Sequence, residues 1–201
     1  MPQVRTAELW HEGEPGLPLV YGLDYEEPVS GILHALKEGG ATAAARPLGV
    51  ALREVLRQAV PILMSHAGMP SDALTPGELV VTCPPSTRAN YRVRGYVPLI
   101  LLLRRAGVRP LELLRPARTG RGRADQSLLG RTERFENMFG SLEVLRAAHG
   151  KTVLLVDDVA TSGATLLECA RALRAGGAEV LGAVTLAHTP RKYSAHSQKN
   201  A

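Results

Sequence analysis

Apolar and polar residues follow helical spacing in four parts of this chain. We predict helices at residues 28–38, 48–66, 96–106 and 164–175. The first should end at Gly39 and Gly40, because glycine commonly terminates helices. Pro61 lies inside the second helix, and its missing backbone donor should kink or divide that helix.

Three runs have the β-branched, apolar character of buried strands: residues 78–83, 152–156 and 179–187. The last two flank the predicted helix 164–175, and strand, helix, strand in that order form one βαβ crossover. Such a crossover predicts an α/β fold with a parallel sheet and helices on both faces. We expect an irregular segment at 1–24, one domain at 25–190 and a polar tail at 191–201.

Two segments lack clear periodicity and are predicted to be loops. The first follows the prolines at 84 and 85 and carries Arg88 and Arg94. The second, at residues 114–131, contains three glycines and five arginines and is expected to be a mobile loop followed by a short helix.

The composition favours an ordinary globular protein of 201 residues, with 45% hydrophobic and 21% charged residues. No apolar run approaches the roughly 18 residues needed to span a bilayer, so we expect a cytoplasmic protein without membrane contact. Cys83 and Cys169 do not form a CxxC pair and therefore indicate neither a disulfide framework nor a zinc site.

The positive charge is concentrated between residues 88 and 134, a segment that contains twelve arginines and three acidic residues. This segment is suited to bind an anion. An arginine-rich surface that is merely solvated remains the alternative, because arginine is the usual cation throughout this chain.

The segment at residues 153–165, VLLVDDVATSGAT, contains the residues most suited to chemistry. Four apolar residues lead into Asp157 and Asp158, which a parallel strand would present at its carboxyl end, where ligands collect. Adjacent carboxylates repel each other unless a cation or hydroxyl groups join them. A ribose diol with Mg²⁺ nearby meets that need.

Small residues then form a turn whose backbone N–H groups can surround a phosphate, with a helix amino terminus behind it. The candidate binding residues are Asp157, Asp158, Ala160, Thr161, Ser162, Gly163, Ala164 and Thr165. A strand ending in two acids, or a capped helix start, would alone be ordinary structure. Both features in register favour a sugar phosphate, and neither GxxxxGK[ST] nor GxGxxG follows a strand.

This segment resembles the phosphoribosyl pyrophosphate (PRPP) signature of type I phosphoribosyltransferases at all thirteen positions. Three further segments resemble the ComF family of phosphoribosyltransferase-like proteins, which is named for DNA uptake in competence. They are residues 25–40 with Tyr25 and Lys37, residues 80–96 ending in Arg94-Gly95-Tyr96, and residues 118–137 with Gln126, Arg131 and Asn137.

Two departures from the ComF pattern bear on function. Family members often carry an amino-terminal zinc ribbon, but no cysteine precedes Tyr25, so zinc is not expected. The family's usual asparagine after Arg-Gly-aromatic is Val97 here.

The resemblance implies transfer of phosphoribosyl from PRPP to a nitrogen acceptor, with release of pyrophosphate and Mg²⁺ as cofactor. Asp157 and Asp158 would hold the ribose and the metal, the latter partly through the ribose hydroxyls. Arg88 and Arg94 would neutralise the pyrophosphate as further catalytic residues. The loop with Arg118, Arg121 and Arg123 would act as a lid.

Three functions remain open at this point: an enzyme for an unidentified acceptor, a PRPP-binding sensor without turnover, and a competence protein that binds single-stranded nucleic acid. A homodimer is also open. We interpret Lys37 as a solvated surface charge. We interpret His34 and His188 as ordinary residues of a helix and of a strand end, without an acid-base role.

Overall fold

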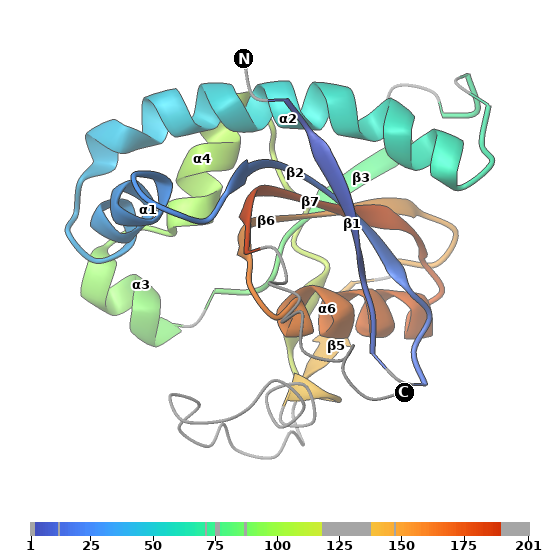
Figure 1. Cartoon of the computed structure of the whole chain (residues 1–201). Coiled ribbons are helices and arrows are strands. Elements are labelled where there is room, and N and C mark those ends of the chain that lie inside the picture. Colours follow the sequence, from blue (N-terminus) through green and yellow to red (C-terminus); the bar gives the residue numbers. More distant parts are fainter. Residues whose placement is uncertain are drawn as a thin grey trace, which may run out of the picture.

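The computed structural model contains a five-stranded sheet and a two-stranded sheet with helices packed around them (Figure 1). It describes residues 3–11, 13–70, 72–74, 77–86, 88–117, 138–146 and 148–189, with the side chains of residues 88–90 excepted. The strands are β1 (Arg5–Leu9), β2 (Leu17–Asp24), β3 (Leu79–Thr82), β4 (Leu114–Pro116), β5 (Leu142–Val144), β6 (Thr152–Ala160) and β7 (Glu179–His188). The helices are α1 (Val29–Lys37), α2 (Ala45–His66), α3 (Arg88–Arg94), α4 (Pro98–Ala106) and α6 (Ala164–Ala175), with the short 3-10 helix η1 (Thr42–Ala44) before α2.

The main sheet has the strand order β1-β2-β7-β6-β3. The pairs β2–β7, β7–β6 and β6–β3 are parallel, which confirms the predicted α/β fold. The outermost pair, β1–β2, is antiparallel, so the sheet is mixed rather than wholly parallel. A short turn suffices for an antiparallel pair, whereas each parallel pair needs a longer crossover.

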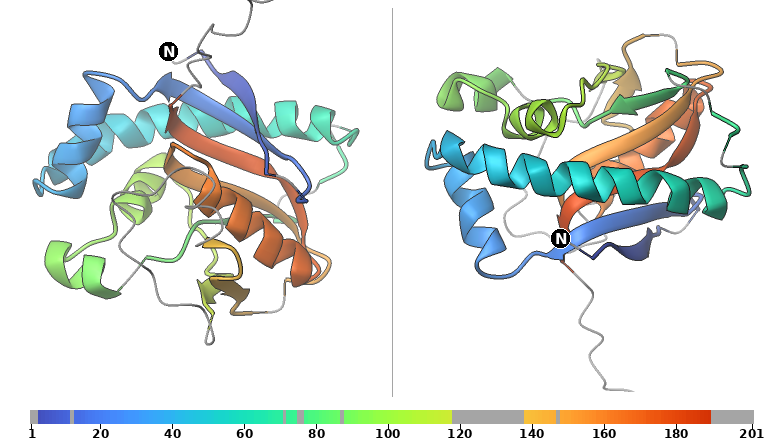
Figure 2. Two further views of the ribbon diagram at one scale, coloured as in Figure 1. Left: turned by 60° about the horizontal axis from the view of Figure 1, so that its bottom comes forward. Right: turned by 90° about the horizontal axis from the view of Figure 1, so that it is seen from above.

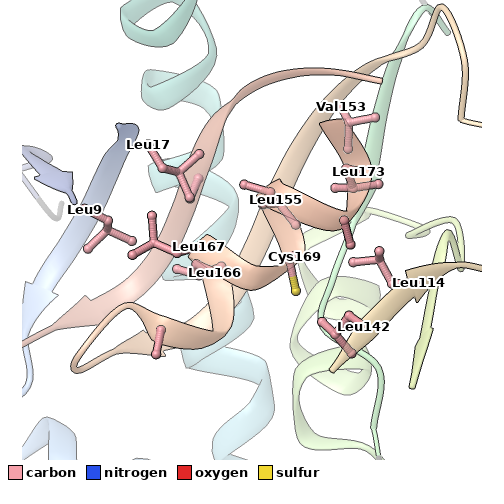
Figure 3. Close-up of a cluster of buried hydrophobic side chains, with 14 of the residues drawn as sticks. Leu9, Leu17, Leu114, Leu142, Val153, Leu155, Leu166, Leu167, Cys169 and Leu173 are labelled. Atoms are coloured by element: carbon pink, nitrogen blue, oxygen red, sulfur yellow. The ribbon is translucent and has the colours of Figure 1, made fainter. Parts of the chain in front are cut away.

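Helices cover both faces of the main sheet, as predicted. Helices α1, α2 and α4 lie on one face and α6 lies on the other, which the two views of Figure 2 make clear. On the α2 face, Leu52 and Leu63 are packed with Val184 of β7. On the α6 face, Leu166 and Leu173 lie among side chains of the sheet and of β4 and β5 (Figure 3). Each such leucine contributes about 1.5–3 kcal/mol by leaving water, so two cores hold the sheet in place.

Residues 5–9 and 17–24 correct the prediction of an irregular opening. Strand β2 lies inside the sheet between β1 and β7, and its Leu17, Leu19 and Val20 are fully buried. A strand buried on both faces has a continuous apolar run instead of an alternating one. β1 is an edge strand with mostly exposed, polar residues, so it has no apolar pattern at all.

Helix α2 continues through Pro61 as one helix of 22 residues, so the predicted division is wrong. Ala59 and Leu63 on either side of the proline are buried against the sheet. Their packing offsets the hydrogen bond that proline removes.

The predicted loop after β3 is partly helical. Residues Arg88–Arg94 form α3, immediately before α4. The second predicted loop begins with strand β4, and its remainder from residue 118 to residue 137 lies outside the described residues. None of the described helices has both the length and the apolarity needed to cross a membrane.

The small sheet of β4 and β5 is fastened to α6 by a buried carboxylate. Glu168 is fully buried, and its Oε1 accepts a hydrogen bond of 2.8 Å from the Leu142 backbone N–H. Arg171 Nε donates to Glu168 Oε2 at 2.7 Å, and Arg171 also donates to the Leu142 carbonyl at 3.0 Å. Residue 142, which begins β5, is thereby tied to the helix that starts at the predicted phosphate turn.

Candidate functional site

Strand β6 extends beyond its predicted end and includes both acids. Its pairing with β7 runs to Ala160, opposite His188. Asp157 and Asp158 therefore lie within a hydrogen-bonded strand, close to its carboxyl end. Because successive side chains of a strand point to opposite faces, the two carboxylates face different surroundings.

Asp158 is paired with a residue far away in the sequence. Lys37 Nζ, in the last turn of α1, lies 2.7 Å from Asp158 Oδ1. The Asp158 side chain is 9% exposed and the Lys37 side chain 31% exposed. The prediction of a merely solvated Lys37 is wrong, because a buried carboxylate requires a partner and α1 supplies it.

Asp157 is on the α6 side of the strand, near Cys169 of α6, whose thiol pKa is raised first by burial and then by the charge of Asp157. Burial, followed by the charge of Asp158, raises the pKa of Asp157 itself to about 7. A hydrogen bond of 2.8 Å from the Asp158 backbone N–H to Asp157 Oδ1 partly offsets this effect. Asp157 therefore gains or loses its proton near neutral pH.

The turn after β6 exposes backbone donors. In the described part of the chain, the N–H groups of Ser162, Gly163 and Thr165 have no hydrogen-bond acceptor, while the Ala164 N–H donates to Ser162 Oγ at 3.3 Å. Helix α6 begins directly behind these donors, so its positive dipole end faces the same space. The predicted phosphate residues are thus contiguous in a turn with this geometry.

Gly163 is required at the centre of this turn for two reasons. Its φ is +78°, in the left-handed region that side chains disfavour. A Cβ at this position would lie 2.8 Å from Leu9 Cδ2, at the end of β1. Strand β1, which was not predicted from the sequence, therefore packs directly on the turn through Leu9.

Arg94 lies at the same end of the molecule, attached to α1. Its NH2 group donates to Glu38 Oε1 at 2.6 Å, and Glu38 follows Lys37. The hydroxyl of Tyr96 donates to the carbonyl of Leu36. The end of α1 is thus joined to both the acid pair and the α3 region. The side chain of Arg88, and Arg118, Arg121 and Arg123 of the predicted lid, lie outside the described residues.

His188 occupies a structural position at the end of β7. It is 6% exposed, its Nδ1 lies 2.7 Å from the Ala160 carbonyl oxygen, and its ring meets the Tyr21 ring edge-on with centroids 4.9 Å apart. These contacts close the end of β6 beside the turn and agree with the predicted structural role.

A cavity of about 1120 Å³ lies between α4, the segment that follows β3, and β4. Its lining includes Cys83, Pro85, Arg104, Leu111, Arg115 and Leu145. Cys83 connects it to the acid pair, since burial and then the charge of Asp157 raise the pKa of the Cys83 thiol to about 12. The cavity itself is lined by neither Asp157 nor Asp158.

Comparison with known proteins concerns the carboxyl-terminal part of the chain. Residues 123–200 match the family model of the phosphoribosyl transferase domain. The matched range includes β5, β6, α6 and β7, and therefore the acid pair with its turn. This match supports the predicted likeness to type I phosphoribosyltransferases. Among curated proteins, none matches the chain significantly.

Two contributors to the site were not predicted from sequence. Thr185 of β7 is directly opposite Asp157, is fully buried, and its Oγ1 has no hydrogen-bond partner among the described residues. Leu9 packs against Gly163. The sequence could have pointed to Thr185, because a single hydroxyl residue within the apolar run at 179–187 is unusual. No feature of the sequence pointed to Leu9.

Proposed function

We propose that the protein binds PRPP with Mg²⁺ at the carboxyl end of β6 and transfers phosphoribosyl to a nitrogen acceptor, releasing pyrophosphate. The junction of β6 and α6 carries the proposal. It combines two differently placed carboxylates with a turn at a helix amino terminus, in which the N–H groups of Ser162, Gly163 and Thr165 have no acceptor among the described residues. The family match over residues 123–200 supports the same chemistry.

Each part of the junction has a role in this proposal. The N–H groups of Ser162, Gly163 and Thr165 would bind the 5-phosphate, since they lack acceptors within the described residues. Carboxylates accept hydrogen bonds from hydroxyl groups, so Asp157 and Asp158 would orient the ribose diol. The ligand would then lie across the end of the strand.

The surroundings of the acids bear on how Mg²⁺ would be held. Asp158 Oδ1 is used by Lys37, and Asp157 Oδ1 accepts the Asp158 N–H. The described residues contain no cluster of three or more His, Cys, Asp or Glu suited to a metal. These facts fit an ion held mainly by oxygens of the ligand, with Asp157 and Asp158 acting through the ribose hydroxyls. When bound, Mg²⁺ would neutralise part of the pyrophosphate charge.

In the proposed reaction the acceptor nitrogen attacks C1 of the ribose. The bond from C1 to the pyrophosphate oxygen breaks, the electron pair leaves with pyrophosphate, and the acceptor releases a proton. The protein's contribution is to hold the ribose and stabilise the leaving anion. Arg88 and Arg94 are proposed for that anion, and the loop with Arg118, Arg121 and Arg123 as the lid that excludes water.

The finer assignment to the ComF family is also a proposal. It rests on residues 25–40 and 80–96, outside the family match, and on residues 118–137. The structure joins the first two segments through Arg94 with Glu38 and Tyr96 with Leu36. These contacts support a shared role of the two segments at one site.

The proposal can be tested by phosphorus NMR of PRPP and Mg²⁺ with the protein and a panel of nucleobases. Appearance of pyrophosphate with one acceptor, and not without it, is the expected result. The variant with Asp157→Asn and Asp158→Asn should lose PRPP affinity by at least tenfold. Unchanged affinity in that variant would overturn the proposed site.

The same experiment separates the alternatives. Binding of PRPP without pyrophosphate release for any base would indicate a sensor. A competence-type role would require binding of single-stranded DNA that weakens steeply with salt, because phosphate contacts release counterions. No DNA binding at low salt would exclude that role.

A further inference from the structure

Lys37 has unused hydrogen-bonding capacity beside the acid pair. An ammonium group has three donors, and Asp158 is its only side-chain partner in the described part of the chain. At 31% exposure the group reaches the surface, whereas Asp158 is almost fully buried. The ammonium is therefore anchored on one side and open on the other.

The end of α1 is held in a defined place by three contacts with other elements. Besides the Lys37–Asp158 pair, Glu38 is bound by Arg94 at 2.6 Å and the carbonyl of Leu36 by the hydroxyl of Tyr96. Three consecutive residues thus bind three separate groups. Figures 1 and 2 show α1 and α3 at the same end of the molecule. Lys37 lies between the acid pair and the segment proposed for pyrophosphate.

The local charges also call for a further cation. Arg94 is paired with Glu38 and Lys37 with Asp158, and Asp157 adds a second carboxylate near Lys37. A ligand carrying a phosphate and a pyrophosphate would be repelled by those carboxylates unless a cation mediated between them. The Lys37 ammonium is already positioned to do so, because its partner Asp158 fixes it without using all its donors.

We propose that Lys37 is a ligand-binding residue that donates hydrogen bonds to the pyrophosphate group of the bound sugar while its salt bridge with Asp158 holds it in place. This inference rests on the proposed function and deepens it. It assigns a wall of the site to α1, more than a hundred residues before the signature segment. A purely structural Lys37 would only neutralise Asp158.

A pyrophosphate-binding Lys37 and a purely structural Lys37 predict different losses of affinity for ligands with and without a pyrophosphate group. Calorimetry with three probes, PRPP, inorganic pyrophosphate and ribose 5-phosphate, each with Mg²⁺, separates them. In Lys37→Met, affinity for PRPP and pyrophosphate should fall roughly tenfold or more, whereas affinity for ribose 5-phosphate should fall much less, through the altered surroundings of Asp158 alone. Lys37→Arg should retain an intermediate affinity for pyrophosphate, because it keeps the charge with another geometry.

Lys151→Met is the matched control. Lys151 is the other lysine in the described residues and precedes β6, at the opposite end of that strand. It should leave all three affinities unchanged.

The double variant Lys37→Met with Asp158→Asn removes the charge and its partner together, which also guards against misfolding from an unpaired buried acid. Pyrophosphate affinity should stay low in it. Recovery to the wild-type value, or equal losses for pyrophosphate and ribose 5-phosphate in Lys37→Met, would overturn the inference.

Failure of the proposed function gives a different result. If the wild-type protein binds neither PRPP nor ribose 5-phosphate, the proposed function fails, and a loss of pyrophosphate affinity in Lys37→Met then assigns Lys37 to a pyrophosphate site alone. If wild-type binds all three and Lys37→Met loses none of them, the function stands and the inference fails.

Discussion

Thr185 of β7 is directly opposite Asp157 of β6 in the parallel pairing of the two strands. The hydroxyl of Thr185 is buried without a partner among the described residues, while burial and Asp158 raise the pKa of Asp157 to about 7. Folding therefore favours the protonated form of Asp157 relative to the unfolded chain, at a position where the paired Thr185 hydroxyl is also buried.

The first prediction concerns stability and pH. The pKa of Asp157 is raised from 3.8 to about 7 in the folded protein. The protonated carboxyl therefore contributes fully to the free energy of unfolding below pH 4, and this contribution is lost as the pH rises through 7. Asp157→Asn should therefore be more stable than wild type at pH 8, by up to about 4 kcal/mol, with the difference shrinking toward pH 4. Urea unfolding across this range measures it. Asp72→Asn, at an exposed position, is the control; a constant difference at all pH values would contradict the prediction.

The second prediction concerns ligand affinity and pH. Asp157 Oδ1 already accepts the Asp158 N–H, so a ribose hydroxyl would donate to the other carboxylate oxygen. A proton on that oxygen would occupy the same place, so PRPP binding should compete with protonation of Asp157. Affinity should fall as the pH drops from 8 to 6, by up to about tenfold per unit below the pKa. PRPP itself also titrates, and Asp157→Asn measured in parallel removes that contribution. The same slope in both proteins would show that Asp157 plays no part.

The third prediction concerns the turn. Gly163→Ala introduces a Cβ at a φ of +78°, 2.8 Å from Leu9 Cδ2, and should cost about 1–3 kcal/mol of stability and weaken ribose 5-phosphate binding. Gly177→Ala is a matched control, with a φ of +79° and a Cβ 2.8 Å from the His149 ring, beyond the other end of α6. It should lose stability without losing affinity. Equal effects on binding would remove the phosphate role of the turn.

The fourth prediction concerns the attachment of β5 to α6. Glu168→Ala leaves the Leu142 N–H and Arg171 without their buried partner and should cost about 3–5 kcal/mol in unfolding free energy. Glu54→Ala removes the exposed ion pair with Arg57 on α2 and should cost less than about 1 kcal/mol. Similar losses in the two variants would contradict the structural role assigned to Glu168.

The local sequence pattern was sufficient to predict those helices and strands whose form depends mainly on their own residues. The segments at 164–175 and 179–187 were predicted within one residue, because helical spacing and a β-branched run are independent of distant partners. β1 and β2 were missed, since an exposed edge strand and a doubly buried strand acquire their character from neighbours. The predicted division of the helix at Pro61 was wrong for a similar reason, because packing around α2 outweighed a local preference.

The sequence by itself determined the signature: two acids after an apolar strand, a turn of small residues and a helix, all contained in residues 153–165. Only the tertiary structure decided that Lys37, 121 residues from Asp158, neutralises it, and that Thr185 and Leu9 complete the surroundings of Asp157 and Gly163. The reason is physical: backbone form follows mainly from nearby residues, whereas the charge state and contacts of a buried group depend on whichever distant segments fold against it.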